Sequence, residues 1–203
     1  MNPAQHWEGV YRRKRPTEVS WYRPHLDVSL NLVTVASTPA SAIVDVGAGE
    51  STLIDDLLAL GYRNLTAMDI SSTALDVAAA RLGEDARSVT WLCGDVRNFA
   101  FGGHAYDVWH DRAVFHFLTD PDDRAAYVQQ CLRAVRTGGH VIVATFGPEG
   151  PSTCSGLPVA RYSAETLHAE FGRSFQLVTH AAEEHQTPWG TPQQFTYCYC
   201  KIA

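Results

Sequence analysis

Asp45, Asp69 and Asp95 each stand at or near the end of a short apolar run. Such runs, rich in β-branched residues, are typical of strands buried on both faces of a parallel sheet. Because ligands bind outside the carboxyl ends of these strands, the three acids should converge on one crevice. An acid at the end of the second strand can accept hydrogen bonds from both ribose hydroxyls. The pattern therefore predicts a nucleoside ligand.

A glycine turn follows the first strand and faces the same crevice. Gly47 and Gly49 interrupt the apolar run, and leucines at helical spacing begin soon after Ser51. Glycine lets the backbone pass close to a ligand, and the helix start offers unpaired N–H groups and a positive dipole end. A dinucleotide-binding turn needs a third small residue, and Thr52 fits that position poorly.

The segment Asp45-Val46-Gly47-Ala48-Gly49-Glu50-Ser51 resembles motif I of the class I S-adenosylmethionine (SAM) methyltransferases, with Ser51 in place of the usual third glycine. The passage Leu132–Ala144 is similar to the helix-to-strand connection of that family, so the resemblance spans roughly residues 41–146. It implies SAM as the cofactor and S-adenosylhomocysteine (SAH) as the product. The implied cofactor contacts are Asp45, Gly47, Ala48 and Gly49 for the methionine end, Asp69 and Ile70 for the ribose, Asp95 and Val96 for the adenine, and Asp111 where cofactor and substrate meet.

The candidate catalytic residues are Asp111 and His116, which follow the strand expected at residues 106–110. In the family this segment is motif IV, where the cofactor and substrate sites meet. A carboxylate or imidazole there can orient a nucleophile or take its proton. His116 lies between two phenylalanines and suits a pocket or a core equally, and Arg112 is a candidate substrate contact. No third ligand is spaced to complete a metal site with His110 and His116, so we expect no metal.

Two further segments are expected to reach the substrate. Residues 1–24 form an N-terminal arm, in which Trp21 and Tyr22 either cover cofactor and substrate as a lid or fasten the arm to the core. Residues 147–162 are rich in glycine and proline, and a connection of this length is more often a binding loop than filler. Cys154, within that loop, is either an inert thiol or a nucleophile.

Hydrophobic periodicity and the resemblance together predict an α/β fold: a three-layer, doubly wound sheet, mostly parallel with an antiparallel C-terminal strand. Expected strands cover residues 43–46, 65–68, 88–93, 106–110, 140–146, 175–180 and 194–202. Expected helices cover residues 3–13, 26–36, 51–60, 71–82 and 163–171, with a further helix from Asp120 that ends at Gly138-Gly139. In the last strand, Phe195, Tyr197 and Tyr199 should face one side, and Cys198, Cys200 and Ile202 the other. We expect one domain over residues 1–203, with the cofactor-binding core at 41–146 and substrate-side elements at 147–203.

Composition limits the possible partners. The hydrophobic fraction of 45% and the charged fraction of 19% are ordinary for a soluble globular protein. A net charge of −6, with no basic run beyond the short cluster at residues 12–15, argues against nucleic acid. The polar N-terminus and the lack of a long apolar stretch argue against a signal peptide and a membrane span. Five cysteines without paired C-x-x-C spacing favour reduced thiols in a cytoplasm, and the oligomeric state stays open.

The sequence therefore predicts a SAM-dependent methyltransferase that acts on a small molecule, with a thiol or another soft nucleophile among the acceptors. A protein lysine methyltransferase is the alternative, because the Trp21-Tyr22 segment resembles a branch that methylates lysines of translation factors. A non-catalytic SAM-binding module remains open. An NAD-dependent oxidoreductase is opposed by Thr52 and by the lack of a Tyr-x-x-x-Lys pair.

Overall fold

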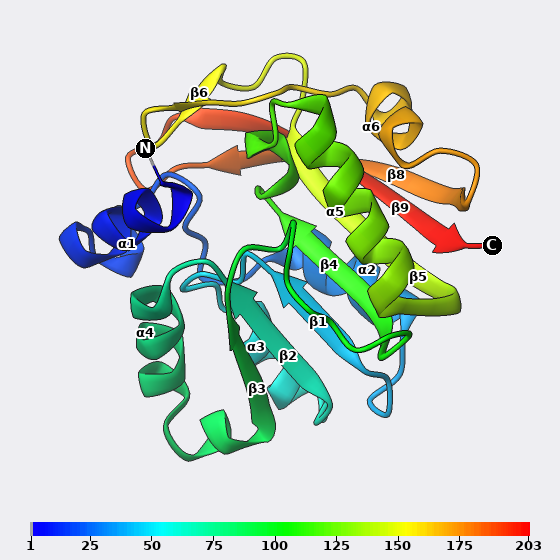
Figure 1. Ribbon diagram of the computed structural model, residues 1–203. Coiled ribbons are helices and arrows are strands. Elements are labelled where there is room, and N and C mark those ends of the chain that lie inside the picture. Colours follow the sequence, from blue (N-terminus) through cyan, green and yellow to red (C-terminus); the bar gives the residue numbers. More distant parts are fainter. Residues whose placement is uncertain (1) are drawn as a thin grey trace.

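The computed structural model describes residues 2–203. Its main feature is a sheet of seven strands in the order β3-β2-β1-β4-β5-β9-β8 (Figure 1). The strands are β1 (Ile43–Val46), β2 (Leu65–Asp69), β3 (Val89–Cys93), β4 (Tyr106–Arg112), β5 (Val135–Phe146), β8 (Phe175–Gln186) and β9 (Pro192–Ile202). Neighbours from β3 to β5 pair in parallel, and β9 is antiparallel to both β5 and β8. The sheet is therefore mostly parallel with an antiparallel C-terminal strand, as predicted.

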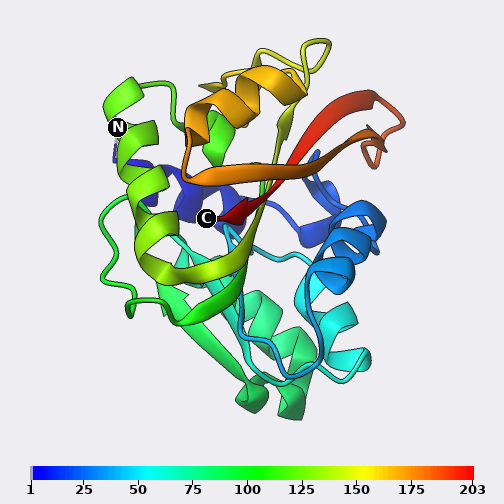
Figure 2. The same cartoon turned by 90° about the vertical axis from the view of Figure 1, so that its right-hand side faces the viewer.

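Helices cover both faces of this sheet. They are α1 (Pro3–Arg13), α2 (Asp27–Ala36), α3 (Leu53–Ala59), α4 (Ser72–Leu82), α5 (Pro121–Ala134) and α6 (Ala164–Phe171), with short 3-10 turns η1 (Pro16–Glu18), η2 (Gly83–Ser88) and η3 (Phe115–Phe117). Apolar residues of α2, α3 and α4 pack on one face, and those of α5 and α6 pack on the other. Figure 2 shows this separation, with α2 and α3 in blue and cyan opposite α5 and α6 in green and orange. The three-layer arrangement predicted from the sequence is confirmed.

Strand β9 divides its side chains between the two cores as its alternation predicts. Phe195, Tyr197 and Tyr199 join the cluster that contains α2, α3 and α4, whereas Cys198, Cys200 and Ile202 join the cluster that contains α5 and α6. Successive side chains of a strand point to opposite faces, so one strand contributes to both layers. The two cysteines of this strand are therefore packing residues.

Several predicted boundaries were wrong, among them the start of β5, which was expected at residue 140. Helix α5 ends at Ala134 instead of Gly138-Gly139, because the fully buried Val135 already pairs with Tyr106 as the first residue of β5. Gly138, at a φ of 76°, then lies in an irregular stretch within β5, where the register to β4 shifts. Strand β8 continues to Gln186, beyond the expected end at residue 180, because β9 offers it a backbone ladder along that whole length. Strand β4 likewise continues past residue 110 to Arg112 along β5.

The 147–162 loop contains a short hairpin, β6 (Thr153–Cys154) and β7 (Leu157–Pro158), which forms a separate two-stranded sheet. It leaves the carboxyl end of β5 and lies near α1 (Figure 1). The arm and the loop, far apart in the sequence, thus meet over the same end of the sheet. No helix among residues 2–203 combines the length and the apolar character needed to cross a bilayer.

Candidate active site

The glycine turn after β1 lies where the chain order of the sheet reverses, the usual place for a ligand in such folds. Gly47 and Gly49 have φ values of 68° and 51°, in the left-handed region that favours glycine. A Cβ on Gly47 would lie 1.9 Å from Val114 Cγ2, and one on Gly49 would lie 2.5 Å from the hydroxyl oxygen of Tyr11. Both positions therefore need glycine for conformation and for space.

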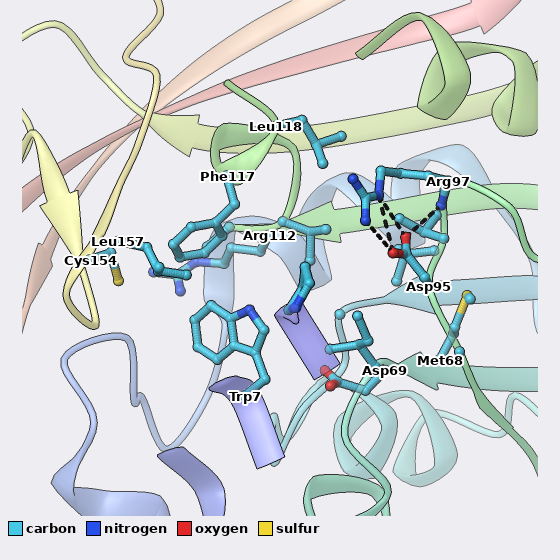
Figure 3. Close-up of a pocket in the computed structure, with 18 of the residues that line it drawn as sticks. Trp7, Met68, Asp69, Asp95, Arg97, Arg112, Phe117, Leu118, Cys154 and Leu157 are labelled. Atoms are coloured by element: carbon cyan, nitrogen blue, oxygen red, sulfur yellow. Dashed lines mark hydrogen bonds and ion pairs between the residues drawn. The ribbon is translucent and has the colours of Figure 1, made fainter. Parts of the chain in front are cut away.

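A cavity of about 230 Å³ opens at the carboxyl ends of β1, β2, β3 and β4. We call its two ends the Asp95 end and the loop end. The Asp95 end is formed by Met68, Asp95, Val96, Arg97 and Asp123, and the loop end by Trp21, Arg112, Phe117, Cys154 and Leu157. Figure 3 shows Phe117, Leu157, Cys154 and Arg112 on one side of the cavity, and Asp95 and Arg97 on the other. The predicted contacts Gly47, Asp69 and Ile70 also line this cavity, and Figure 3 shows Asp69 between the two ends.

Asp69 is held in place by the glycine turn. Its carboxylate accepts hydrogen bonds from the backbone N–H groups of Gly49 at 2.9 Å and Ser71 at 2.8 Å. Burial raises the pKa of Asp69 to about 6, although these backbone donors act in the opposite direction. Each carboxylate oxygen has a further lone pair, so the group can still accept hydrogen bonds from a ligand.

Asp95 is engaged by Arg97, which the sequence analysis did not single out. The Arg97 guanidinium donates to both Asp95 oxygens, at 2.9 Å to Oδ1 and 2.5 Å to Oδ2, and lowers the pKa of Asp95. Arg97 also pairs with Asp123, at the start of α5, at 2.7 Å. The Asp-x-Arg spacing was visible in the sequence as a signal of such a pair. A ligand amino group at Asp95 would therefore share this carboxylate with Arg97.

A second, smaller cavity of about 40 Å³ adjoins the glycine turn and shares Trp21, Gly47 and Arg112 with the first cavity. Its lining includes Asp45, Ala48, Glu50 and His110, and His110 Nδ1 is 2.7 Å from Asp45 Oδ1. Within residues 2–203, Asp45 Oδ2, Glu50 Oε2 and His110 Nε2 are buried and have no hydrogen-bond partner. Burial raises the pKa of Glu50 to about 7. Such orphaned polar atoms need an explanation, and an amino acid group with an ammonium and a carboxylate would supply partners for them.

Asp111 and His116, the predicted catalytic residues, are fully buried. Asp111 accepts hydrogen bonds from the N–H groups of Val114 and Phe115, at 2.8 and 3.1 Å, and from the Tyr127 hydroxyl at 2.6 Å. Burial raises its pKa to about 6. These bonds fix the turn that starts η3, and the linings of both cavities, among the residues that the structure describes, leave Asp111 out. The catalytic role of Asp111 stays a prediction that this geometry does not favour.

His116 is turned away from the cavity by η3, which aims the next residue, Phe117, into the lining. Its Nδ1 accepts a hydrogen bond from the backbone N–H of Phe146 at 3.3 Å, and its ring packs on those of Phe117 and Phe146. Burial lowers the pKa of His116 to about 3, so the ring is neutral at physiological pH. His116 therefore lies as a packed core residue, and its catalytic role is likewise a prediction without support from the geometry.

The N-terminal arm covers the cavity with aromatic rings. Trp7, Tyr11 and Trp21 line it, and the Trp7 ring centroid is 4.9 Å from that of Phe117. Tyr22 lines the second cavity. Glu8 of α1 accepts a hydrogen bond from Ser71 Oγ at 2.6 Å and others from Thr73, at the start of α4. The arm thus both packs on the core and covers the cavity, and Glu8 was not anticipated because its partners lie more than sixty residues away.

Arg112 joins the arm to the sheet at the loop end. Its Nε donates to the Tyr197 hydroxyl at 3.2 Å, and its other nitrogens reach Glu183 and the carbonyl oxygen of Trp21, each at 3.4 Å. The guanidinium carbon lies 4.1 Å from the centre of the Phe195 ring. The buried Glu183 was also missed, because a lone acid in a strand carries no motif.

Cys154 lines the loop end and is 7% exposed. Burial raises the pKa of its thiol, so the group is protonated at neutral pH and a poor nucleophile. Among the described residues there is also no cluster of three or more His, Cys, Asp or Glu side chains that could hold a metal ion.

Comparisons with known proteins identify similarity to methyltransferases over most of the sheet. The family description "Methyltransferase domain" matches residues 43–139. The chain is 24% identical over 152 residues to the eEF1A lysine and N-terminal methyltransferase of Danio rerio, which covers 73% of this chain and 22% of that protein. It thus spans about a fifth of that relative's length.

Two further relatives differ in what their names say they methylate. The ubiquinone biosynthesis O-methyltransferase of Parvibaculum lavamentivorans is 25% identical over 150 residues, which is 70% of this chain and 58% of that protein. The human EEF1A lysine methyltransferase 2 is 21% identical over 203 residues, which is 93% of this chain and 78% of that protein.

Solved structures of low sequence identity share the fold. One comes from a study of the conversion of a disulfide bond into a thioacetal group during echinomycin biosynthesis. It has a TM-score of 0.77 and 19% identity, and the matched region is 98% of this chain and 92% of that chain. A SAM-dependent methyltransferase from Anabaena variabilis has a TM-score of 0.75 and 15% identity, and covers 100% of this chain and 96% of its own.

Proposed function

We propose that this protein, a class I SAM-dependent methyltransferase, transfers the methyl group of SAM to a small molecule. The choice of a small-molecule acceptor rests on one observation: the N-terminal arm and the 147–162 loop both cover the loop end of the main cavity. The arm contributes Trp7 and Trp21 to the cavity wall, and the 147–162 loop contributes Cys154 and Leu157. An acceptor enclosed by two separate segments has to be compact, as a small molecule is.

The residues around the two cavities fit SAM. Asp69 would hold the ribose, and Asp95 with Val96 would hold the adenine at the Asp95 end. The amino acid end would lie along the glycine turn toward the second cavity, where the orphaned oxygens of Asp45 and Glu50 suit an ammonium. When bound, SAM supplies a methyl carbon that its sulfonium already activates.

The chain then has to position the acceptor and exclude water, since methyl transfer needs a close, aligned approach of two atoms. Trp7, Trp21, Phe117 and Leu157 supply an apolar wall for this purpose. In such surroundings a soft nucleophile, for example a thiol, needs little help from a base. This agrees with the burial of Asp111 and His116 away from the cavity.

A protein lysine is the second candidate acceptor. The observation that favours it is the relation to the human EEF1A lysine methyltransferase 2, which extends over 93% of this chain. The composition of the loop end favours the small molecule instead, because its one charged residue is Arg112 and a lysine ammonium would be repelled there. The methyltransferase matches argue against an NAD-dependent oxidoreductase.

Methyl incorporation from isotope-labelled SAM tests the proposal. The protein is incubated with a panel of thiols, phenols and amines in one arm and with a proteome in the other. We expect SAH release and label in a small thiol or a related soft acceptor. Label confined to protein bands would replace this proposal with the lysine one, and SAM binding without SAH release in either arm would indicate a non-catalytic SAM-binding protein.

A further inference from the structure

We propose that Arg112 selects an acceptor that binds as an anion, with its attacking sulfur already ionised as a thiolate or hydrosulfide. This inference rests on the proposed function and names the acceptor class of the same site. It depends on three features of the loop end: a cation in the wall, a counter-charge that is too small to neutralise it, and the lack of a base.

The cation is the guanidinium of Arg112, which lines both cavities and whose side chain is 5% exposed. A guanidinium carries five N–H donors in a fixed fork. Three contacts hold it, and the two to Glu183 and Trp21 are long, at 3.4 Å. Donors therefore remain for a ligand, and charged donors of this kind bind anions more strongly than neutral ones do. Figure 3 shows Arg112 on the same side of the cavity as Phe117 and Cys154.

The counter-charge is Glu183, which Arg112 shares with Arg23. Arg23 lies 3.0 Å from Glu183 Oε1, closer than Arg112 lies to Oε2. Asp27, the other carboxylate beside Arg23, is 74% exposed and 3.6 Å away, so solvent screens it. One buried carboxylate thus faces two guanidinium groups, and the cluster keeps a net positive charge toward the loop end.

The histidine and tyrosine side chains around Arg112 add no negative charge. The carboxylates Asp45 and Glu50 share the second cavity with Arg112 but lie outside the lining of the main cavity. Burial lowers the pKa of His116 to about 3 and lowers that of His185, so both rings are neutral. Burial raises the pKa of Tyr197 to about 12, so its hydroxyl stays protonated. The cationic character of the loop end therefore persists across the physiological pH range.

A base for the acceptor is missing from the loop end among the residues that the structure describes. The ionisable side chains there are Arg112 and Cys154, and burial raises the pKa of that thiol. Tyr11 also lines the cavity, and burial raises its pKa well above 10. The carboxylates of the lining, Asp69, Asp95 and Asp123, lie in the middle and at the Asp95 end. An acceptor that must lose a proton therefore loses it to solvent before transfer.

Thiols meet this requirement better than alcohols or amines. A free thiol has a pKa of about 8.5, and a neighbouring cation lowers it to the neutral range or below. A phenol ionises near 10, and an amine near 10.4 would enter as a cation. In the transfer step the thiolate sulfur forms a bond to the methyl carbon while the bond from that carbon to the sulfonium breaks. The products are a neutral thioether and SAH, and no proton moves.

Thiolate absorbance tests this inference without turnover. The absorbance of benzenethiol is followed as the pH is changed in the presence of protein and SAH. Calorimetry measures the binding of hydrosulfide, a smaller anion, and of benzylamine, a cation, for comparison. We expect the bound benzenethiol to ionise at least one pH unit below the free compound. In Arg112→Met that shift should vanish and the affinity should fall about tenfold or more. The double variant Arg112→Met/Glu183→Gln removes both charges of the pair. It replaces the single variant in this test if Arg112→Met does not fold.

Arg23→Met is the matched control, because it removes a cation from the same carboxylate but outside the loop end. Because Arg23→Met leaves Glu183 to pair with Arg112 alone, it should weaken thiol binding, but by less than Arg112→Met does. SAH titration shows for each variant that the cofactor site is intact. An unshifted thiol, tighter binding of benzylamine, or equal losses in Arg112→Met and Arg23→Met would overturn the inference. If benzenethiol is methylated but ionises normally, the proposed function stands and this inference fails. If SAH binds but no small molecule binds or is methylated, both fail.

Discussion

Asp45 and His110 face each other across the pairing of β1 and β4, with His110 Nδ1 2.7 Å from Asp45 Oδ1. Both side chains are buried, and each keeps one polar atom without a partner among residues 2–203. The pair orients the free Asp45 oxygen toward the second cavity. It therefore connects the interior of the sheet to the place proposed for the amino acid end of SAM.

Asp45→Asn should weaken SAH binding about tenfold to a hundredfold, since a hydrogen bond to a charged group contributes roughly 1.5–3 kcal/mol. Calorimetry measures the change. Asp107→Asn is the matched control, because Asp107 lies on β4, the strand of His110, but binds Ala42 and Arg136 away from the cavities. Equal SAH affinity in Asp45→Asn and the wild-type protein, with the fold intact, would contradict the assignment.

Glu50 should make the protein less stable as the pH rises. Its pKa in the folded chain is about 7, raised from 4.5 by burial, so the folded state binds more protons than the unfolded state between these values. Stability from this group is therefore present below about pH 4.5 and is lost as the pH rises through 7. Glu50→Gln should remove this pH-dependent loss of stability, because glutamine does not ionise.

Thermal unfolding from pH 4 to 8 measures this effect. We expect Glu50→Gln to match the wild-type protein near pH 4 and to unfold about 2–4 °C higher at pH 8, equivalent to about 1 kcal/mol once solvent contact of the side chain is allowed for. A constant difference between the two proteins across this range would show that Glu50 titrates normally.

Glu8 fastens the arm to the start of α4. The hydroxyl donors of Ser71 and Thr73 lower the pKa of Glu8 to about 2, so it is ionised and bonded throughout the neutral range. Glu8→Ala should release α1, and hydrogen exchange over residues 3–13 should then be faster in the variant without ligand. SAH binding should weaken about threefold to tenfold, in line with the loss of a few partly buried hydrogen bonds.

The control for this variant is Glu84→Ala, since Glu84 pairs with Arg87 on an exposed turn. SAH should slow exchange of both the arm and the 147–162 loop in the wild-type protein, because covering segments close on their ligand. If exchange of Trp21, Tyr22 and the loop is the same with and without SAH, neither segment acts as a lid.

The sequence was sufficient where a feature depends on residues close along the chain. The glycine turn follows from Gly47 and Gly49, which need their φ values locally, and the two-sided burial of β9 follows from its alternation. Contacts between distant segments could not be predicted in this way. Glu8 reaches Ser71 only because α1 packs on α4, and Arg112 meets Glu183 only because β8 extends beyond its predicted end.

The two catalytic candidates show the same limit. Their positions just past β4 were consistent with a pocket, but the direction of each side chain depends on the turn that follows. Asp111 accepts from the backbone of that turn, and η3 places Phe117, instead of His116, in the cavity wall. Residue type and spacing therefore indicated the region but not which side chain enters it.

Asp111 should accordingly contribute to stability more than to catalysis. Asp111→Asn replaces a charged acceptor of three hydrogen bonds with an amide. We expect the free energy of unfolding to fall by about 2–3 kcal/mol. The folded variant should keep methyl transfer within about threefold of the wild-type rate, because Asp111 contacts the lining residue Val114 but does not itself line the cavity. Denaturant unfolding and initial rates measure the two effects, and a stable variant that loses transfer would restore Asp111 as a catalytic residue.

Calorimetric titration of SAH into the wild-type protein and Asp69→Ala tests most directly whether the main cavity holds SAM. Asp69 supports the glycine turn through Gly49 and would bind the ribose. We expect one SAH to bind the wild-type protein, and the variant to lose roughly 2–4 kcal/mol of binding free energy while its circular dichroism is unchanged. Unaltered SAH affinity in the folded variant, or preferential binding of NAD by the wild-type protein, would contradict the placement of the cofactor.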